Sequence, residues 1–169
     1  MMKKLASFVL FAVVAVATAS AADSGVSRYV EHLKTSRDFT LKVAQQMPDA
    51  DYGYKLTDQQ MSFAQQLVHL SGANASFCAA LSGEKSPVDK PGSMKKAEVI
   101  DFIGKSYDYC IKVVSGASTE QMNKSFKAED GTMSGWELVM LALDHSTHHR
   151  AQCEMYLRSK GITPTSYEF

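Results

Sequence analysis

The residues best suited to chemistry are histidines, and three of the five lie in one short segment. They are His32, His69, His145, His148 and His149. On a helix, residues four apart lie on one face, so His145 and His149 can address a single metal ion. His148 is rotated by about 100° from His149. A site built from His145 and His148, three residues apart, is the alternative.

A third ligand is expected from another helix, and His69 is the candidate. The apolar residues from Leu138 to Tyr156 follow a stripe that includes positions 145 and 149, so both histidines should face the interior. His69 and His145 each lie about 17 Å from the start of a predicted helix, at 1.5 Å per residue. The other interpretation of His69 is a core histidine, and His32 is most simply a surface residue.

Three neutral imidazole nitrogens favour zinc, nickel, copper or ferrous iron over calcium or magnesium. We expect one divalent transition metal, zinc first, with nickel or iron as alternatives. Three protein ligands leave positions open for water or substrate, which is typical of a catalytic zinc site. A di-iron carboxylate bundle would need Glu-x-x-His repeats, and the sequence has none.

Four helices are expected to position these histidines. We predict them over residues 24–47, 57–82, 94–114 and 134–159, from apolar residues at helical spacing. The second and fourth begin with capping-box patterns, Thr57 to Gln60 and Ser134 to Glu137. One more helical turn is expected near residues 119–122. No segment shows a sustained apolar alternation with a period of two, so the sequence predicts an all-α four-helix bundle.

The first 22 residues have the pattern of a cleaved secretory signal. Lys3 and Lys4 precede an uncharged apolar run to Ala17, and small residues follow. The run is shorter than the about 20 residues that a membrane-spanning helix needs, so we predict cleavage before Ala22 or Asp23. The expected mature chain, residues 23–169, is one domain that is periplasmic or secreted and has no stable membrane anchor.

Charge and cysteine content exclude several classes of protein. The chain has 18 basic and 18 acidic residues and no basic cluster after the signal, which argues against binding to nucleic acid. Its three cysteines, Cys78, Cys110 and Cys153, form no C-x-x-C motif, so a c-type haem and a thioredoxin-like site are not expected. At most two cysteines can pair within the chain, and Cys153 is expected to be a buried thiol.

The sequence resembles the DinB/YfiT-like superfamily of bacterial four-helix bundles over most of the mature chain. That family has a histidine on its second helix, a His-x3-His-Arg-Gly-Gln motif on its fourth, and a Tyr-Leu-Arg-x-x-Gly-x-x-Pro ending. The matching segments here are residues 67–70, 145–152 and 156–164. One departure is Ala151, where the family usually has glycine. The resemblance implies metal binding by His69, His145 and His149.

The resemblance also implies an up-down-down-up topology, in which the second and third helices run parallel and a long crossover joins them. Residues 82–93 can span at most about 40 Å when extended, enough to return along the bundle. In this topology Cys78 and Cys110 lie near the same end, and a disulfide between them can form. In a simple hairpin these cysteines would lie about 20 Å apart. Homodimers are common in the family.

Two functions are compatible with these features. The resemblance implies a metal-dependent activity of the type found in this family. Its members with assigned activity look like transferases and isomerases that use thiols, and related members are suspected hydrolases. The first hypothesis is an exported metal-dependent hydrolase or transferase acting on an unidentified small molecule. The alternative is a non-catalytic periplasmic protein that binds metal or a small ligand. Asp144 and Asp108 are candidate general bases by residue type alone. Gln152 and His148 are candidates to hydrogen-bond a ligating histidine or a bound ligand, and Arg150 is expected to form an ion pair.

Overall fold

Four long helices dominate the computed structural model, which describes residues 13–128 and 131–168. They are α1 (Val13–Gln46), α2 (Phe63–Ser82), α3 (Lys96–Ser115) and α5 (Gly135–Ser159). The shorter elements are η1 (Asp49–Asp51), α4 (Thr119–Asn123), β1 (Ser125–Ala128) and β2 (Gly131–Ser134). The predicted all-α four-helix bundle is confirmed, and α4 is the short turn expected near residues 119–122.

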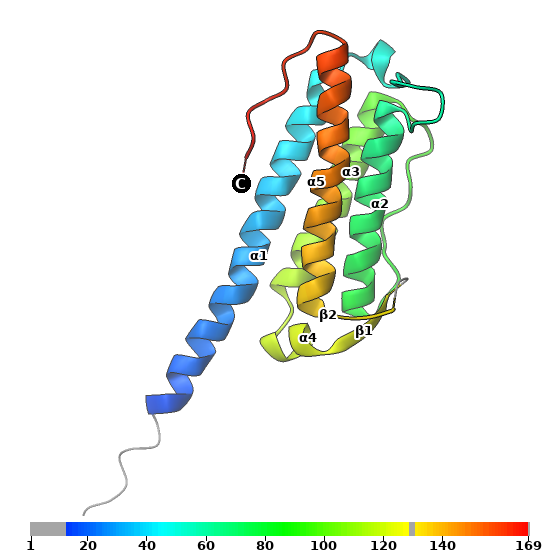
Figure 1. The fold of residues 1–169 in the computed structure, drawn as a ribbon. Coiled ribbons are helices and arrows are strands. Elements are labelled where there is room, and N and C mark those ends of the chain that lie inside the picture. Colours follow the sequence, from blue (N-terminus) through cyan, green and yellow to red (C-terminus); the bar gives the residue numbers. More distant parts are fainter. Residues whose placement is uncertain (1–12, 129–130, 169) are drawn as a thin grey trace, which may run out of the picture.

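The long helices form a ring in which α2 and α3 run in the same direction (Figure 1). Helix α2 packs against α3 and α5, and α1 closes the ring by packing against the same two helices. Lys96, at the start of α3, donates a hydrogen bond of 2.9 Å to the carbonyl oxygen of Met47, just after α1. The segment between α2 and α3 therefore returns along the length of the bundle, as the family resemblance implied.

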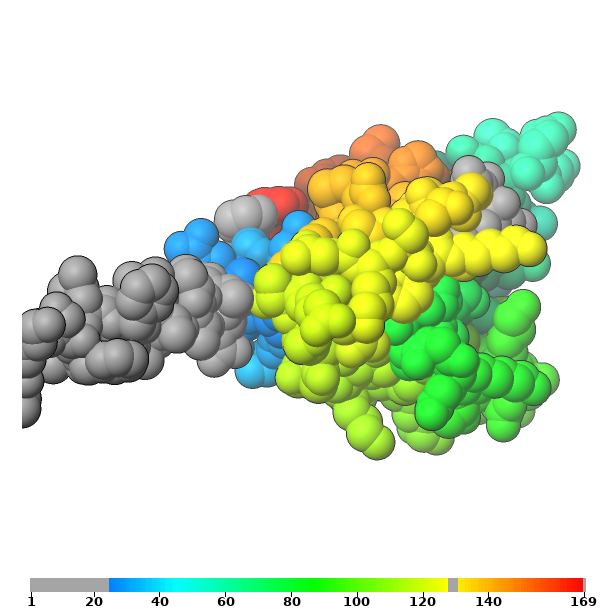
Figure 2. Space-filling view, turned by 90° about the horizontal axis from the view of Figure 1, so that it is seen from below, coloured from blue at the N-terminus to red at the C-terminus, as the bar shows by residue number. Residues whose placement is uncertain are grey.

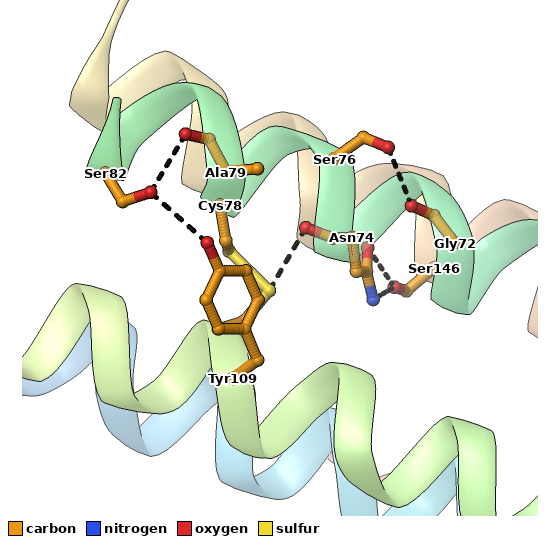
Figure 3. Close-up of a disulfide and its surroundings, with 9 residues drawn as sticks. Gly72, Asn74, Ser76, Cys78, Ala79, Ser82, Tyr109 and Ser146 are labelled. Atoms are coloured by element: carbon orange, nitrogen blue, oxygen red, sulfur yellow. Dashed lines mark hydrogen bonds between the residues drawn. A yellow bond between two sulfur atoms is a disulfide. The ribbon is translucent and has the colours of Figure 1, made fainter. Parts of the chain in front are cut away.

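A disulfide joins α2 and α3 near the end of the bundle at which both helices finish (Figure 3). It links Cys78 to Cys110, whose Cα atoms are 5.3 Å apart and which are 32 residues apart in the chain. The hydroxyl groups of Ser82 and Tyr109 form a hydrogen bond of 3.2 Å beside it. Cys153 is a buried free thiol, as predicted.

The predicted start of α2 is wrong by six residues. Ser62 is the N-cap, and its side chain forms a capping box with Gln65, whereas Thr57 and Gln60 form an exposed turn. Both segments have a capping-box pattern, and burial decides between them, because Phe63 and Ala64 are the first pair of this segment that enters the core. The preceding loop is tied to the helix by a backbone hydrogen bond from Phe63 to Tyr54, 2.9 Å long.

A short antiparallel hairpin between α4 and α5 was not predicted from the sequence. Each strand has only four residues, and Ser125 pairs with Ser134. Strands of this length are too short to show a periodic apolar pattern. Together with α4, the hairpin covers one end of the bundle (Figure 2). Ser134 then caps α5 in the predicted capping box with Glu137.

Helix α1 begins at Val13, before the start expected at residue 24. Figure 1 shows its first turns projecting beyond the other helices. The expected signal segment overlaps these turns, and its cleavage remains a prediction. None of the helices in the described part of the chain combines the length and apolarity that crossing a membrane would require.

A layer of buried polar side chains divides the core into two apolar clusters. One cluster includes Phe39, Phe63 and Tyr156, and the other includes Leu81 and Leu138. The polar layer consists of Ser36, Thr40, Gln66, Ser71, Asn74, Ser106, Ser146, His149 and Arg150. Buried polar groups are costly unless they have partners, so a polar layer at mid-bundle is where function is most expected.

Candidate metal centre

Three histidines from two helices meet at the level of the polar layer. His69 comes from α2, and His145 and His149 come from α5. Their ligand atoms all lie within 4.8 Å of one another. The ring centroid of His69 lies 5.0 Å from that of His145 and 4.6 Å from that of His149. The centroids of His145 and His149 are 4.4 Å apart. His149 is buried, His145 is half-buried and His69 is exposed, so the cluster opens to solvent on the side of α2.

Hydrogen bonds between α2 and α5 fix the register that brings these rings together. On one side of the cluster, Asn74 and Ser146 exchange two side-chain hydrogen bonds of 2.8 and 3.2 Å. On the other side, the Tyr156 hydroxyl donates at 2.7 Å to the carbonyl oxygen of Met61, which lies just before α2. Because the two helices are antiparallel between these points, His69 lies opposite the pair on α5.

Gln66 sets the orientation of the His149 ring. Its Oε1 lies 2.5 Å from Nδ1 of His149, and its Nε2 donates to Oε1 of Gln152, also at 2.5 Å. Gln152 Nε2 in turn lies 2.8 Å from Nε2 of His148. A carbonyl oxygen can only accept, so Nδ1 of His149 carries the proton and Nε2 keeps its lone pair. Metal-binding histidines are commonly oriented in this way.

Burial keeps His145 and His149, the two cluster histidines on α5, neutral. Desolvation, followed by the charges of the neighbouring imidazoles, lowers the pKa of His149 from 6.5 to about 4. Desolvation also lowers the pKa of His145, and Phe77 packs edge-on against its ring, with centroids 6.1 Å apart. Metal ligation requires neutral imidazole, and both groups meet this requirement at neutral pH.

The residues present fit a divalent transition metal. The donor set is three imidazole nitrogens, and no carboxylate belongs to the cluster among the described residues. Nδ1 of His145 is buried and has no hydrogen-bond partner there, which is costly for a polar atom. Nitrogens bound to one zinc ion lie about 3.4 Å apart, so the cluster must contract slightly, and the exposed ring of His69 has the most freedom to move.

A cavity of about 530 Å³ adjoins the cluster on the side of His69. Its lining is mostly apolar, with one cation from the segment between α2 and α3: Met61, Gln65, Val68, His69, Gly72, Ala73, Ser76, Phe77, Lys90 and Met94. Since Phe77 also contacts His145, the cavity lies against two members of the cluster. A small molecule bound there would lie next to the imidazoles.

The other candidate residues lie in different places. His148 is exposed and lies outside the three-histidine cluster, so the alternative pair of His145 with His148 is not formed. Asp144 is close enough to His145 to oppose the lowering of its pKa. Asp108 pairs with Arg37 at 2.7 Å, between α1 and α3, and is therefore removed from the cluster. Ala151 is exposed, so nothing requires glycine at that position.

Gln66 and Arg150 have roles in the structure that were not predicted from the sequence. Gln66 was missed, and the one signal for it was an amide three residues before His69, which places both on one side of the helix. Arg150 is buried and forms no ion pair with a described carboxylate; it binds hydroxyl groups instead.

Comparisons with known proteins agree on the type of fold. A family model described as the DinB family matches residues 19–169. An uncharacterised protein of Bacillus subtilis, YjoA, is 22% identical over 142 residues, which cover 81% of this chain and 92% of that protein. The crystal structure of this DinB-like protein superposes with a TM-score of 0.71 at 20% identity, covering 83% of this chain and 96% of that one. A DinB-like protein of Bacillus cereus superposes with a TM-score of 0.72 at 14% identity, over 82% and 95% of the two chains. At these identities the structures show the fold alone.

Proposed function

The chain belongs to the DinB family, and on this premise we propose that it is an exported metal-dependent enzyme of the hydrolase or transferase type. His69, His145 and His149 hold one divalent transition metal ion, with zinc as the first candidate and nickel or iron as alternatives. The observation that carries the proposal is the convergence of three imidazoles from two helices beside an open cavity.

The chemistry of the site divides between the ion and the surrounding residues. A bound divalent ion would activate water or polarise a substrate carbonyl group. The protein supplies the ligand geometry through Gln66, which holds the His149 ring, and through the bonds of Asn74 to Ser146, which hold the two helices in register. Three ligands leave coordination positions open, as a catalytic site requires.

The cavity beside His69 is the proposed substrate site. Its methionine, valine and phenylalanine side chains favour a ligand with an apolar body, and Lys90 can pair with an anionic or strongly polar group. Such a mixture of apolar walls and a few polar groups is typical of small-molecule sites.

His148 and Asp144 are the proposed proton acceptors. Both line a second hollow on the surface of α5, together with Gln152 and Met155. Nε2 of His148 accepts a hydrogen bond from Gln152, which leads through Gln66 to His149. His148 is thus an exposed base that is linked to a ligand by one chain of hydrogen bonds, and it takes up a proton at Nε2 when Gln152 releases that nitrogen. It is the better candidate, because no such link to Asp144 is found among the described residues.

Two features support export. The start of the sequence has the basic, apolar and small-residue pattern of a secretory signal. The Cys78–Cys110 disulfide is typical of an oxidising compartment such as the periplasm.

The second candidate function is a non-catalytic periplasmic protein that binds metal or a small ligand. One observation favours it: among the described residues, no carboxylate belongs to the histidine cluster, where a general base would be most effective.

Turnover distinguishes the two functions. Mature protein loaded with zinc, nickel or iron is assayed with panels of esters, amides and thiol acceptors, beside a chelated sample. The enzyme proposal predicts metal-dependent turnover that His145→Ala abolishes, that His148→Gln lowers at least tenfold with metal content unchanged, and that His32→Ala leaves intact. Stoichiometric metal without turnover on any panel would favour the binding protein.

A further inference from the structure

Arg150 is a buried cation whose hydrogen-bond partners in the described part of the chain are all neutral. The residue is 3% exposed. Nη1 donates to the hydroxyl groups of Ser36 at 3.1 Å and Thr40 at 3.3 Å, and Nη2 donates to that of Thr147 at 3.3 Å. The guanidinium group also lies 4.3 Å from the centre of the Phe39 ring. Across residues 25–128 and 131–168, no carboxylate lies within ion-pair distance of it.

This arrangement orients the charge of Arg150 without neutralising it. Buried charges in proteins are ordinarily paired with an opposite charge. The hydroxyl groups around Arg150 are themselves engaged: Thr40 donates to the carbonyl oxygen of Ser36 at 2.7 Å, and both contact the Tyr107 hydroxyl. They hold the guanidinium group in place and supply no countercharge.

The guanidinium group borders a cavity of about 450 Å³ between α1 and α5, which we call the α1–α5 cavity. Tyr29, Met140 and Leu143 form an apolar wall, and Arg28, Thr35 and Thr147 are among the polar lining residues. Arg150 and Thr147 face this cavity, whereas His69 lies on the far side of α5 against α2. The cavity is therefore separate from the histidine cluster and its adjoining cavity.

The C-terminal tail closes one side of the α1–α5 cavity and runs back alongside α1 (Figure 1). Gln46 holds the tail with two hydrogen bonds of 2.9 Å to the backbone of Thr163 and Thr165. Glu168, which lines the cavity, pairs with Lys42 at 2.6 Å. With Glu168 neutralised in this way, the remaining charged lining residues are Arg28, Arg150 and Asp144, and the two cations outnumber the one carboxylate.

We propose that the α1–α5 cavity binds a small organic carboxylate with a short apolar body. The carboxylate group pairs with the two N–H groups of Arg150, one on Nε and one on Nη2, that do not bind Ser36, Thr40 or Thr147. This edge of the guanidinium group is suited to bidentate recognition. The exposed Arg28 provides further donors, and the body of the ligand packs against Tyr29, Met140 and Leu143. The Thr147 hydroxyl donates to the carbonyl oxygen of Leu143 and accepts from Nη2 of Arg150, so its part is to position the guanidinium group. This site is independent of the proposed metal centre.

Calorimetry on metal-free protein tests the proposal. Chelator-treated, dialysed protein is titrated with butyrate and benzoate, and with butyramide and benzamide, which have the same shape without the charge, at constant ionic strength. We expect saturable one-to-one binding of a carboxylate and binding of its amide at least tenfold weaker. His145→Ala should bind the carboxylate as the wild type does, because metal plays no part.

Four variants locate the site. Arg150→Lys, which keeps the charge and loses the fork, and Thr147→Val should each weaken carboxylate binding, the first by at least tenfold. Arg28→Gln should weaken it less, and Arg158→Gln, an exposed arginine on the same helix, should leave it unchanged. If Arg150→Lys does not fold, as judged by circular dichroism, Thr147→Val and the comparison of amide with carboxylate still test whether the carboxylate binds at this site. No saturable carboxylate binding in the millimolar range would overturn the proposal, and so would equal binding of amide and carboxylate, or binding that survives both changes at Arg150 and Thr147.

Discussion

Replacing Gln66 with leucine tests whether the buried amide tunes the metal site. The change keeps the approximate volume of the side chain and removes the oxygen that lies 2.5 Å from Nδ1 of His149, together with the bond to Gln152. Without the acceptor, the proton is no longer fixed on Nδ1, and the ring is less strongly held in the orientation that presents Nε2.

The expected loss is larger in metal affinity than in folding stability. Loss of a partner of a ligating histidine weakens metal binding by about 10–100-fold, which corresponds to about 1.4–2.8 kcal/mol. Leaving buried polar groups without a partner costs about 1–3 kcal/mol of unfolding free energy. Burial of leucine in place of the amide offsets about 1–2 kcal/mol of that cost.

Gln65→Leu is the matched control. Gln65 is the neighbouring glutamine on α2, but it is exposed, and its Oε1 accepts a hydrogen bond of 2.8 Å from the backbone of Ser62 in the capping box. Its loss should lower stability by about 0.5–1 kcal/mol and leave metal affinity unchanged. The assay is competition for zinc against a chromophoric chelator, with urea unfolding of both apo proteins. Equal zinc affinities for the two variants would refute the role assigned to Gln66.

Three further predictions concern stability. In metal-free protein, the pKa of His149 is lowered to about 4 in the folded state from 6.5. The unfolded chain therefore binds more protons than the folded chain below pH 6.5, and the free energy of unfolding should fall by up to about 3 kcal/mol as the pH drops from 6.5 to 4. Urea unfolding with chelator at pH 7 and pH 4.5 measures this fall, and an equal fall in His149→Leu would contradict the role of His149. Replacing Cys78 and Cys110 by serine opens a cross-link that spans 32 residues, which should cost about 3–4 kcal/mol and lower the melting temperature by about 10 °C; calorimetric scans would show no shift if the disulfide contributed nothing. At Gly135 an added Cβ would lie 2.8 Å from the Met122 Cα atom, whereas at Gly104 nothing lies within 4 Å; thermal melts should show Gly135→Ala destabilised by about 1–3 kcal/mol and Gly104→Ala stabilised by about 0.4–1 kcal/mol, and the reverse order would contradict the packing of α4 on α5.

Features that depend on one helix alone could be predicted from the local sequence. The spacing of His145 and His149 is a property of one helix, and their placement on one face of α5 follows from it. Ser134 and Glu137 likewise cap α5 as expected, because the apolar residues that follow enter the core directly. The Thr57 pattern was equally good as a local signal and failed, because the residues after it remain exposed as far as Met61.

Features that depend on two or more helices could not be derived from one segment. The contact of Gln66 with His149 joins residues 83 positions apart, and it depends on the register of α2 against α5. The expected ion pair of Arg150 was wrong for the same reason: its partners are hydroxyl groups of α1, more than 100 positions away, and of its own helix. The hairpin of β1 and β2 is too short to have a periodic pattern at all.

Metal content of the purified mature protein tests the central claim most directly. Elemental mass spectrometry is applied to the wild type, to the double variant His145→Ala/His149→Ala, and to His32→Ala as a control. We expect close to one zinc, nickel or iron per chain in the wild type and in the control, and its loss in the double variant. Absence of metal from the wild type, even after reconstitution with each of the three ions, or its retention in the double variant, would show that His145 and His149 do not bind a metal ion.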